Sequence, residues 1–222
     1  MMSPVGHYEP IAREGYVFII PPFLIAFGFW WYSYPWISLV FLLISVGIAL
    51  FFRNPERATL EDPATVLSPA DGRVVQIESN VQSRNIPDRS FKRISIFMSV
   101  FNVHVNRWPT SGSVRKITHV PGGFVDARFP AASLTNEHNS IVLDTDEGPI
   151  EVVQIAGMIA RRIACWVREG DTVRQGERLG LIRFGSRVDV YLPEDFTFTV
   201  DLGTRVSAGM TVIASKVDSN TN

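Results

Sequence analysis

The longest uncharged stretch of the chain constrains its fold more than any other feature. From Gly15 to Phe52, 38 consecutive residues carry no charged side chain. A cleaved signal peptide has an apolar core of only about 7–15 residues, which excludes that interpretation. One helical crossing of a bilayer needs about 20 residues, so the stretch is too long for one crossing and tight for two. We therefore expect a membrane-anchoring helical hairpin.

Two proline sites indicate where this hairpin is divided. Pro21-Pro22 and Tyr34-Pro35 divide it into segments of roughly 16–33 and 36–52. The cluster at 30–36 contains three tryptophans and two tyrosines, the composition of an interfacial aromatic belt. We expect this cluster at the tip of the hairpin. A hairpin buried in the core of a soluble protein is the alternative.

The basic residues around the hairpin predict its orientation. Arg13 precedes the apolar stretch, and Arg53 and Arg57 follow it. Positive charge tends to remain cytoplasmic, so both ends of the hairpin, and everything after Arg53, are expected on the cytoplasmic side of the cell membrane. We assign residues 1–57 to the anchor and its linker, and residues 58–222 to a second domain.

Residues 58–222 have the pattern of a mainly β domain, in which short strands alternate with turns. The segment 169–182 contains a Gly-x-x-Val-x-x-Gly pattern, and the segment 202–213 repeats it. This pattern is typical of the hairpin corners of lipoyl and biotinyl carrier domains. We expect a flattened barrel or sandwich of short strands with carrier-like β-hairpins.

Composition excludes several classes of function. The net charge of −1 provides no general attraction for nucleic acid. Cys165 is the only cysteine, so neither an intramolecular disulfide nor a cysteine-based zinc site is possible. A lipoyl or biotinyl carrier needs a lysine at a hairpin tip, and none of the three lysines occupies such a position. A zinc peptidase would need a histidine where Asn106 stands, so we expect no metal.

The segment Leu181–Pro193 has the pattern of two short strands interrupted by Gly185-Ser186. Glycine reaches backbone angles that are closed to other residues and lets another group approach its carbonyl. The Ser186 hydroxyl is then placed to attack that carbonyl, and local strain lowers the barrier to an N-to-O acyl shift. β-Elimination of the resulting ester leaves a dehydroalanine, which hydrolyses to a pyruvoyl group. A Gly-Ser pair alone is far more often a flexible turn, so this interpretation depends on the surrounding motifs.

Three motifs together resemble those of the phosphatidylserine decarboxylase proenzymes, particularly their short form. They are Ser68-Pro-Ala-Asp-Gly72, Phe101-Asn-Val-His-Val-Asn-Arg-Trp-Pro109 and Gly185-Ser186, in this order. The resemblance runs from about Arg53 to about Ala214 and includes the apolar N-terminal stretch. It implies a membrane-attached, pyruvoyl-dependent lyase of phospholipid biosynthesis. Such an enzyme is made as a self-cleaving zymogen and converts phosphatidylserine to phosphatidylethanolamine.

The resemblance also implies roles for single residues. Cleavage between Gly185 and Ser186 would give a long and a short chain that remain associated, with the pyruvoyl group from Ser186 as the covalent cofactor. Its ketone would form a Schiff base with the serine amine of the lipid. His104 would protonate the carbanion left by CO2, and Asp71 would assist self-processing. A higher oligomer is compatible with this assembly.

The residues alone leave other roles open for His104 and Asp71. His104 alternates with Asn102 and Asn106, which predicts three polar side chains on one face of a strand and makes His104 a candidate for proton transfer. Asp71 stands at the corner of a turn, where an aspartate often has only a structural role. Many longer family members have a second histidine where this chain has Arg107, so the base for self-cleavage stays open. A membrane-anchored phosphocarrier that uses His104 is the alternative function.

Overall fold

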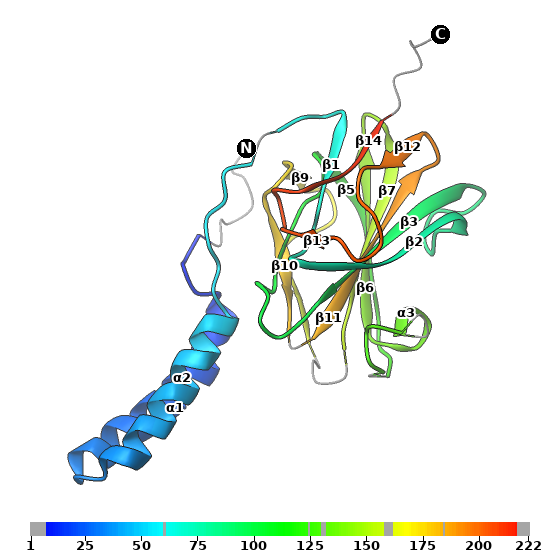
Figure 1. Ribbon diagram of the computed structural model, residues 1–222. Coiled ribbons are helices and arrows are strands. Elements are labelled where there is room, and N and C mark those ends of the chain that lie inside the picture. The colour runs from blue at the N-terminus through cyan, green and yellow to red at the C-terminus, as the bar shows by residue number, and fades with distance from the viewer. Residues whose placement is uncertain are drawn as a thin grey trace. The chain divides into compact units, whose positions relative to one another are not determined.

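The computed structural model divides the chain into a helical unit and a β unit (Figure 1). It describes residues 8–59, 61–123, 125–129, 132–157, 162–183 and 185–216. One compact unit spans His7–Glu56, and the other contains Arg57–Asn222.

The helical unit is a hairpin of two apolar helices, α1 (Arg13–Trp31) and α2 (Pro35–Phe51). The turn between them falls within the aromatic cluster, as the sequence predicts, and Ser33 takes a left-handed φ of 62° there. The expectation that Pro21-Pro22 divides the stretch is wrong, because α1 continues through both prolines. Long apolar helices tolerate proline where neighbouring groups satisfy the freed backbone carbonyls.

Hydrogen bonds between side chain and backbone join the two helices. Ser38 Oγ donates to the Ala26 carbonyl at 2.8 Å, and Ser45 Oγ donates to the Ile19 carbonyl at 2.9 Å. Helix α1 is long and apolar enough to cross a bilayer, whereas α2 is shorter, with 17 residues. Most large apolar side chains of both helices are exposed. These features indicate membrane association for this unit.

The β unit is built around one curled, eight-stranded antiparallel sheet that forms a half-barrel. Its strands, in spatial order, are β13 (Arg205–Val206), β2 (Gly72–Gln82), β3 (Ser90–Met98), β11 (Ser186–Pro193), β7 (Gly148–Ile155), β6 (His138–Thr145), β5 (Gly112–Val120) and β9 (Thr172–Val173).

Two three-stranded sheets and a short helix complete the β unit as far as the structure describes it. One sheet contains β1 (Thr65–Leu67), β14 (Val212–Lys216) and β12 (Phe196–Phe198); the other contains β4 (Val105–Arg107), β10 (Arg178–Ile182) and β8 (Ile163–Cys165); the helix is α3 (Ala132–Thr135). The prediction of a mainly β fold preceded by a helical hairpin is confirmed.

The two faces of the large sheet bury different side chains. Strand β11 alternates, so Val188 and Val190 point into the main core with Ile94 and Ile96 of β3. Tyr191 points to the opposite face, where it joins a smaller apolar cluster. Strand β11 is buried along almost its whole length because β3 and β7 flank it and both of its faces are covered. Ser186, the first residue of this strand, is therefore buried.

The two carrier-like corners adopt the same structure at opposite edges of the large sheet. Gly170 and Gly203 both have left-handed φ angles, of 88° and 86°. The Gly170 amide donates to the Val114 carbonyl at 2.7 Å, and the Gly203 amide donates to the Val74 carbonyl at 2.8 Å. The repeated Gly-x-x-Val-x-x-Gly pattern thus corresponds to two equivalent turns, which only glycine enters without strain.

Candidate active site

Gly185-Ser186 forms the junction between two sheets. Strand β10 pairs with β4 and β8, whereas β11, which begins at Ser186, pairs with β3 and β7. The expected pair of short strands interrupted by Gly185-Ser186 is therefore present. Gly185 has a left-handed φ of 62°, a conformation that a residue with a Cβ adopts only at a cost. Ser186 lies directly opposite Met98 of β3.

The carbonyl group of Gly185 packs against the backbone of Gly157. A Cβ atom placed on Gly157 would lie 1.7 Å from the Gly185 oxygen and 2.9 Å from its carbonyl carbon. Van der Waals contact begins well beyond such distances, so only glycine at position 157 admits this carbonyl. The sequence gives no direct sign of this contact, because the two glycines are far apart in the chain and neither belongs to a shared motif.

Asn136 fixes the segment that ends in Gly157. Its Nδ2 atom donates to the Ala156 carbonyl at 2.8 Å and to the Val125 carbonyl at 2.6 Å, and its Oδ1 atom accepts from the Val125 amide at 2.8 Å. The Ala156 amide also donates to the Glu137 carbonyl at 2.9 Å. Asn136 is buried, so these bonds are shielded from water. The surface that receives the Gly185 carbonyl is consequently held in place.

The side chain of Ser186 is buried, and its hydroxyl has no hydrogen-bond partner among the described residues. A buried hydroxyl without a partner costs on the order of 1–3 kcal/mol, so it requires an explanation. Its position next to the left-handed Gly185 supplies one, since a hydroxyl not held elsewhere is available to attack the preceding carbonyl.

Buried amide side chains line the same face of the sheet as Ser186. Gln154 pairs with Val188, so it shares the core face with Ser186, two residues earlier on the same strand. Its Nε2 atom donates to Asn106 Oδ1 at 2.9 Å, and its Oε1 atom accepts from Asn139 at 3.2 Å. Asn106 in turn contacts the sulfur of Met98 at 3.5 Å. This network provides neutral polar groups inside the core, next to the junction.

His104 is fully buried and immediately precedes β4. Its Nδ1 atom lies 3.0 Å from the Asn102 carbonyl. Because a carbonyl only accepts hydrogen bonds, Nδ1 carries the proton, and Nε2 is the atom that can take up or deliver one. Val105 pairs with Leu181, which places His104 at the end of β4 nearest the Gly185 junction.

The expected alternation of three polar residues does not extend to Asn102. The strand begins only at Val105, and Asn102 lies in the preceding turn, where its Oδ1 atom accepts from the Ser99 amide at 2.9 Å. Asparagine readily forms such local bonds, which compete with the strand. His104 and Asn106 are both buried, and the proton-transfer role of His104 stays a prediction.

Asp71 lies in the turn before β2 and makes an ion pair with Arg57. The pair is bidentate, with distances of 2.6 and 2.8 Å, and the Ala208 amide donates to the same carboxylate at 2.8 Å. Strands β2 and β11 are both neighbours of β3, so Asp71 and Ser186 are separated by two strand spacings, or about 10 Å.

Arg107, the residue that leaves the base for self-cleavage open in the sequence, lies against the two carrier-like corners. It is buried, and its Nη1 atom donates to the Gly176 carbonyl at 2.8 Å. Its alkyl chain lies against Gly209 in the second carrier-like corner. Arg107 therefore supports the two corners.

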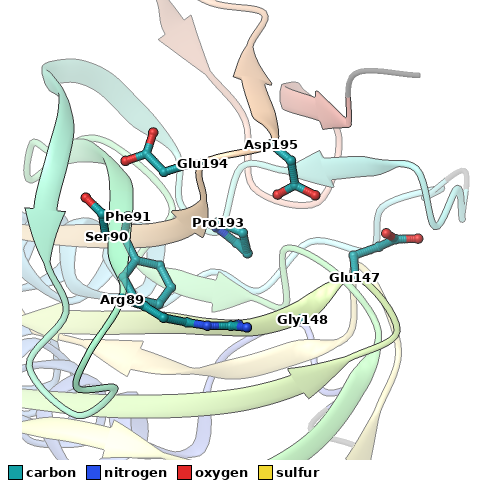
Figure 2. Close-up of a pocket in the computed structure, with 8 residues that line it drawn as sticks. All are labelled: Arg89, Ser90, Phe91, Glu147, Gly148, Pro193, Glu194 and Asp195. Atoms are coloured by element: carbon teal, nitrogen blue, oxygen red, sulfur yellow. The ribbon is translucent and has the colours of Figure 1, made fainter. Parts of the chain in front are cut away.

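An open cleft of about 460 Å³ lies at the other end of β11 (Figure 2). Arg89 extends past Pro193 toward Gly148 there, and carboxylates from Glu147, Glu194 and Asp195 surround the opening (Figure 2). Pro193 ends the strand that Ser186 begins, so the cleft is about 20 Å from the junction. It is therefore distinct from the Gly185-Ser186 site.

Comparison with known proteins places the chain in one family. A family model described as phosphatidylserine decarboxylase matches residues 47–214. A phosphatidylserine decarboxylase proenzyme from Syntrophus aciditrophicus is 45% identical over 210 residues, which cover 91% of this chain and 96% of that protein. The match takes in the turn with Asp71, the segment with His104 and the Gly185-Ser186 junction. This chain belongs to the phosphatidylserine decarboxylase family.

Proposed function

We propose that this chain decarboxylates phosphatidylserine to phosphatidylethanolamine with a pyruvoyl group that it makes from its own Ser186. The family membership carries the decarboxylase activity. The observation that supports the self-made cofactor is the buried Ser186 hydroxyl, which has no hydrogen-bond partner within the described part of the chain and lies beside a left-handed glycine. When formed, the pyruvoyl group supplies a ketone that captures the substrate amine and accepts the electron pair released with CO2.

Self-cleavage begins at the Gly185 carbonyl. The Ser186 oxygen attacks the carbonyl carbon, the C–N bond breaks and an ester replaces the peptide. β-Elimination then releases Gly185 as a carboxylate and leaves dehydroalanine at position 186. Uptake of one water and loss of one ammonia convert it to the pyruvoyl group. Gly157 supports this sequence because it holds the carbonyl that is attacked.

His104 is proposed to deliver a proton to the substrate carbon that loses CO2. Its Nδ1–H is engaged by the Asn102 carbonyl, which fixes the ring and directs Nε2 to the chemistry. Burial excludes bulk water, so protonation by this ring competes with little else.

Asp71 is proposed to serve as the base for self-processing. The ion pair with Arg57 and the Ala208 amide keep its carboxylate in one orientation. Two strand spacings separate it from Ser186, so the proposal includes a relay group between them.

The two products of cleavage are proposed to remain associated. The short chain would begin with β11, which lies between β3 and β7 of the long chain and pairs with β3 along eight residues. It would also contribute β14, which pairs with β1. Separation would expose the central strand of the core, at a large cost in buried apolar surface.

The helical hairpin is proposed to anchor the enzyme to the cell membrane, with the β unit facing the cytoplasm. Apolar residues cover the outside of both helices, and basic residues flank them at Arg13 and Arg53. A membrane anchor suits a substrate whose acyl chains stay in the bilayer. A tag at the C-terminus should be cleaved by added protease only in inverted membrane vesicles, whereas cleavage on intact spheroplasts would contradict the orientation.

The burial of His104 argues against the phosphocarrier alternative. A histidine that exchanges phosphate with partner proteins must be reached by them, whereas His104 has no exposed surface. The carrier-like corners are present, but they support the core on both edges of the large sheet.

Intact mass of the purified protein tests the proposal most directly. We expect two fragments, residues 1–185 and a carbonyl-reactive fragment 186–222. Because one water is taken up and one ammonia is lost, their summed mass should exceed that of the uncut chain by about one dalton. An active enzyme that remains a single uncut chain, with an ordinary serine at 186, would exclude the pyruvoyl mechanism.

Three variants separate the proposed roles. Ser186→Ala should stay uncut and inactive, and Asp71→Asn should stay largely uncut. His104→Ala should lose at least about 100-fold in turnover per pyruvoyl group, as expected for loss of a general acid. Full turnover in His104→Ala, or normal cleavage in Asp71→Asn, would remove that residue from its proposed role.

A further inference from the structure

Several exposed apolar side chains gather at the end of the β unit at which Ser186 lies. Phe101 is 84% exposed and Phe129 is 58% exposed; Val100, Val120 and Val125 are exposed to 37–42%. We call these five residues the apolar rim. Single exposed apolar residues are common on proteins, whereas several gathered at one end indicate an interaction surface.

The strand register shows that the rim lies at the Ser186 end. Val120 pairs with His138, His138 with Ile155, and Ile155 with Arg187, the residue after Ser186. These pairs form one row across the sheet, and Val120 is the last residue of its strand. In Figure 1 this end of the β unit is the lower one, where α3 lies.

The other rim residues leave the sheet at the same row. Arg187 also pairs with Phe97, and Val100 and Phe101 follow within four residues of Phe97. The Arg128 guanidinium lies 6.0 Å from the centre of the Phe97 ring, which places the neighbouring Phe129 here as well. Val125 is held by Asn136, two residues before His138.

We propose that the apolar rim inserts into the surface of the bilayer that contains the substrate, as a membrane contact separate from the helical hairpin. This inference rests on the proposed function, because the serine headgroup must reach Ser186 while its acyl chains remain in lipid. Exposed phenylalanines beside arginines are the composition of segments that lie at the boundary of headgroups and acyl chains. Arg162 is exposed and Arg183 precedes the junction by two residues, which favours an anionic lipid surface.

Turnover of two forms of the substrate tests the role of the rim. Phe101→Ser and Phe129→Ser, in the full-length chain, should cleave themselves normally. In vesicles of phosphatidylcholine and long-chain phosphatidylserine, the turnover of each variant should fall about tenfold. Each substitution removes one large apolar side chain that would be buried in the lipid. With dispersed dihexanoyl phosphatidylserine their turnover should equal that of the wild type. Leu202→Ser is the matched control, because Leu202 is 67% exposed in a turn outside the rim.

Spin labels at the same positions test the contact without any turnover. A nitroxide on Phe101→Cys or Phe129→Cys, in a Cys165→Ser background, should become accessible to oxygen and shielded from a water-soluble nickel reagent when the protein is in vesicles. A label on Leu202→Cys should remain in water. This measurement distinguishes failure of the rim from failure of the proposed decarboxylation, because it needs no active enzyme.

Several results would overturn the proposal. Equal losses on vesicles and on the dispersed lipid would make the rim part of the site wall, and unchanged turnover on both would leave it without a role. Labels that stay in water in vesicles would exclude insertion. Labels that are shielded from both oxygen and the nickel reagent in vesicles would indicate a second protein chain in place of lipid.

Discussion

Gly157→Ala should block self-cleavage by displacing the carbonyl that Ser186 attacks. The new Cβ would lie 1.7 Å from the Gly185 oxygen, and real Cβ contacts under 3.0 Å essentially never occur. One of the two groups must therefore move by at least 1.3 Å, the difference between 3.0 and 1.7 Å. A misplacement of about 1 Å can cost a reaction about 100-fold, and overpacking costs a further 1–3 kcal/mol of stability, roughly.

The assay is the time course of fragment formation after a pulse of cell-free synthesis, followed by intact mass. Gly112→Ala is the control, because its Cβ would lie 2.3 Å from the Asp144 carbonyl, at a strand away from the junction. We expect cleavage to be at least about 100-fold slower in Gly157→Ala and near normal in Gly112→Ala.

The Gly157→Ala substitution should have little effect on the enzyme once cleavage has occurred. The Gly185 carbonyl then belongs to a free carboxylate, so whatever Gly157→Ala protein does mature should decarboxylate normally per pyruvoyl group. Cleavage of folded Gly157→Ala at the wild-type rate would refute this role of Gly157. Equally slow cleavage in Gly112→Ala would also refute it, because overpacking anywhere in the domain would then explain the effect.

Three further predictions concern the buried charged and titratable groups. Asp189→Asn leaves the fully buried Arg187 without its ion-pair partner at 2.5 Å, so it should lower the free energy of unfolding, measured in urea, by about 3–5 kcal/mol. Ser95→Ala removes only a neutral partner of Arg187 and should lower it by about 1 kcal/mol. Burial lowers the pKa of His138 from its ordinary 6.5, so the unfolded chain binds this proton first and stability falls as the pH drops below that value. His138→Gln should weaken the dependence of the melting temperature on pH between about pH 7 and about pH 5. An unchanged dependence would assign the loss of stability in acid to other groups. Burial also raises the pKa of the Cys165 thiol, so a thiol reagent should react with it at least about tenfold more slowly in the folded than in the unfolded protein; equal rates would contradict this.

Local patterns predict the parts of this fold that depend on neighbouring residues. The uncharged stretch and its aromatic tip predict the hairpin because an apolar helix needs nothing beyond its own composition to be recognised. The repeated glycine pattern predicts the two corners because a left-handed turn depends on a single residue type. The break at Gly185-Ser186 is predicted for the same reason.

Partners that are distant in the chain are not predicted by such patterns. The contact between Gly157 and Gly185 joins two segments through β7 and β11, and no spacing within either segment reports it. Asn102 was expected on a strand because the alternation of polar residues continues through it, but its local bond to Ser99 ends the strand first. In both places the deciding energy comes from one specific contact, which the residue type alone does not determine.

The charged residues of β11 show why the burial of this strand is not predicted from the sequence. Arginine and aspartate are almost never fully buried unless they are paired, and the sequence pattern does not show that Arg187 and Asp189 pair with each other. In the structure each neutralises the other on one covered face of the sheet, and Ser186, which points to the opposite face, is buried in the core. A reactive hydroxyl that must attack its own backbone benefits from this burial, because water would otherwise compete for the ester. The ion pair thus allows the strand that begins at Ser186 to be covered on its second face as well.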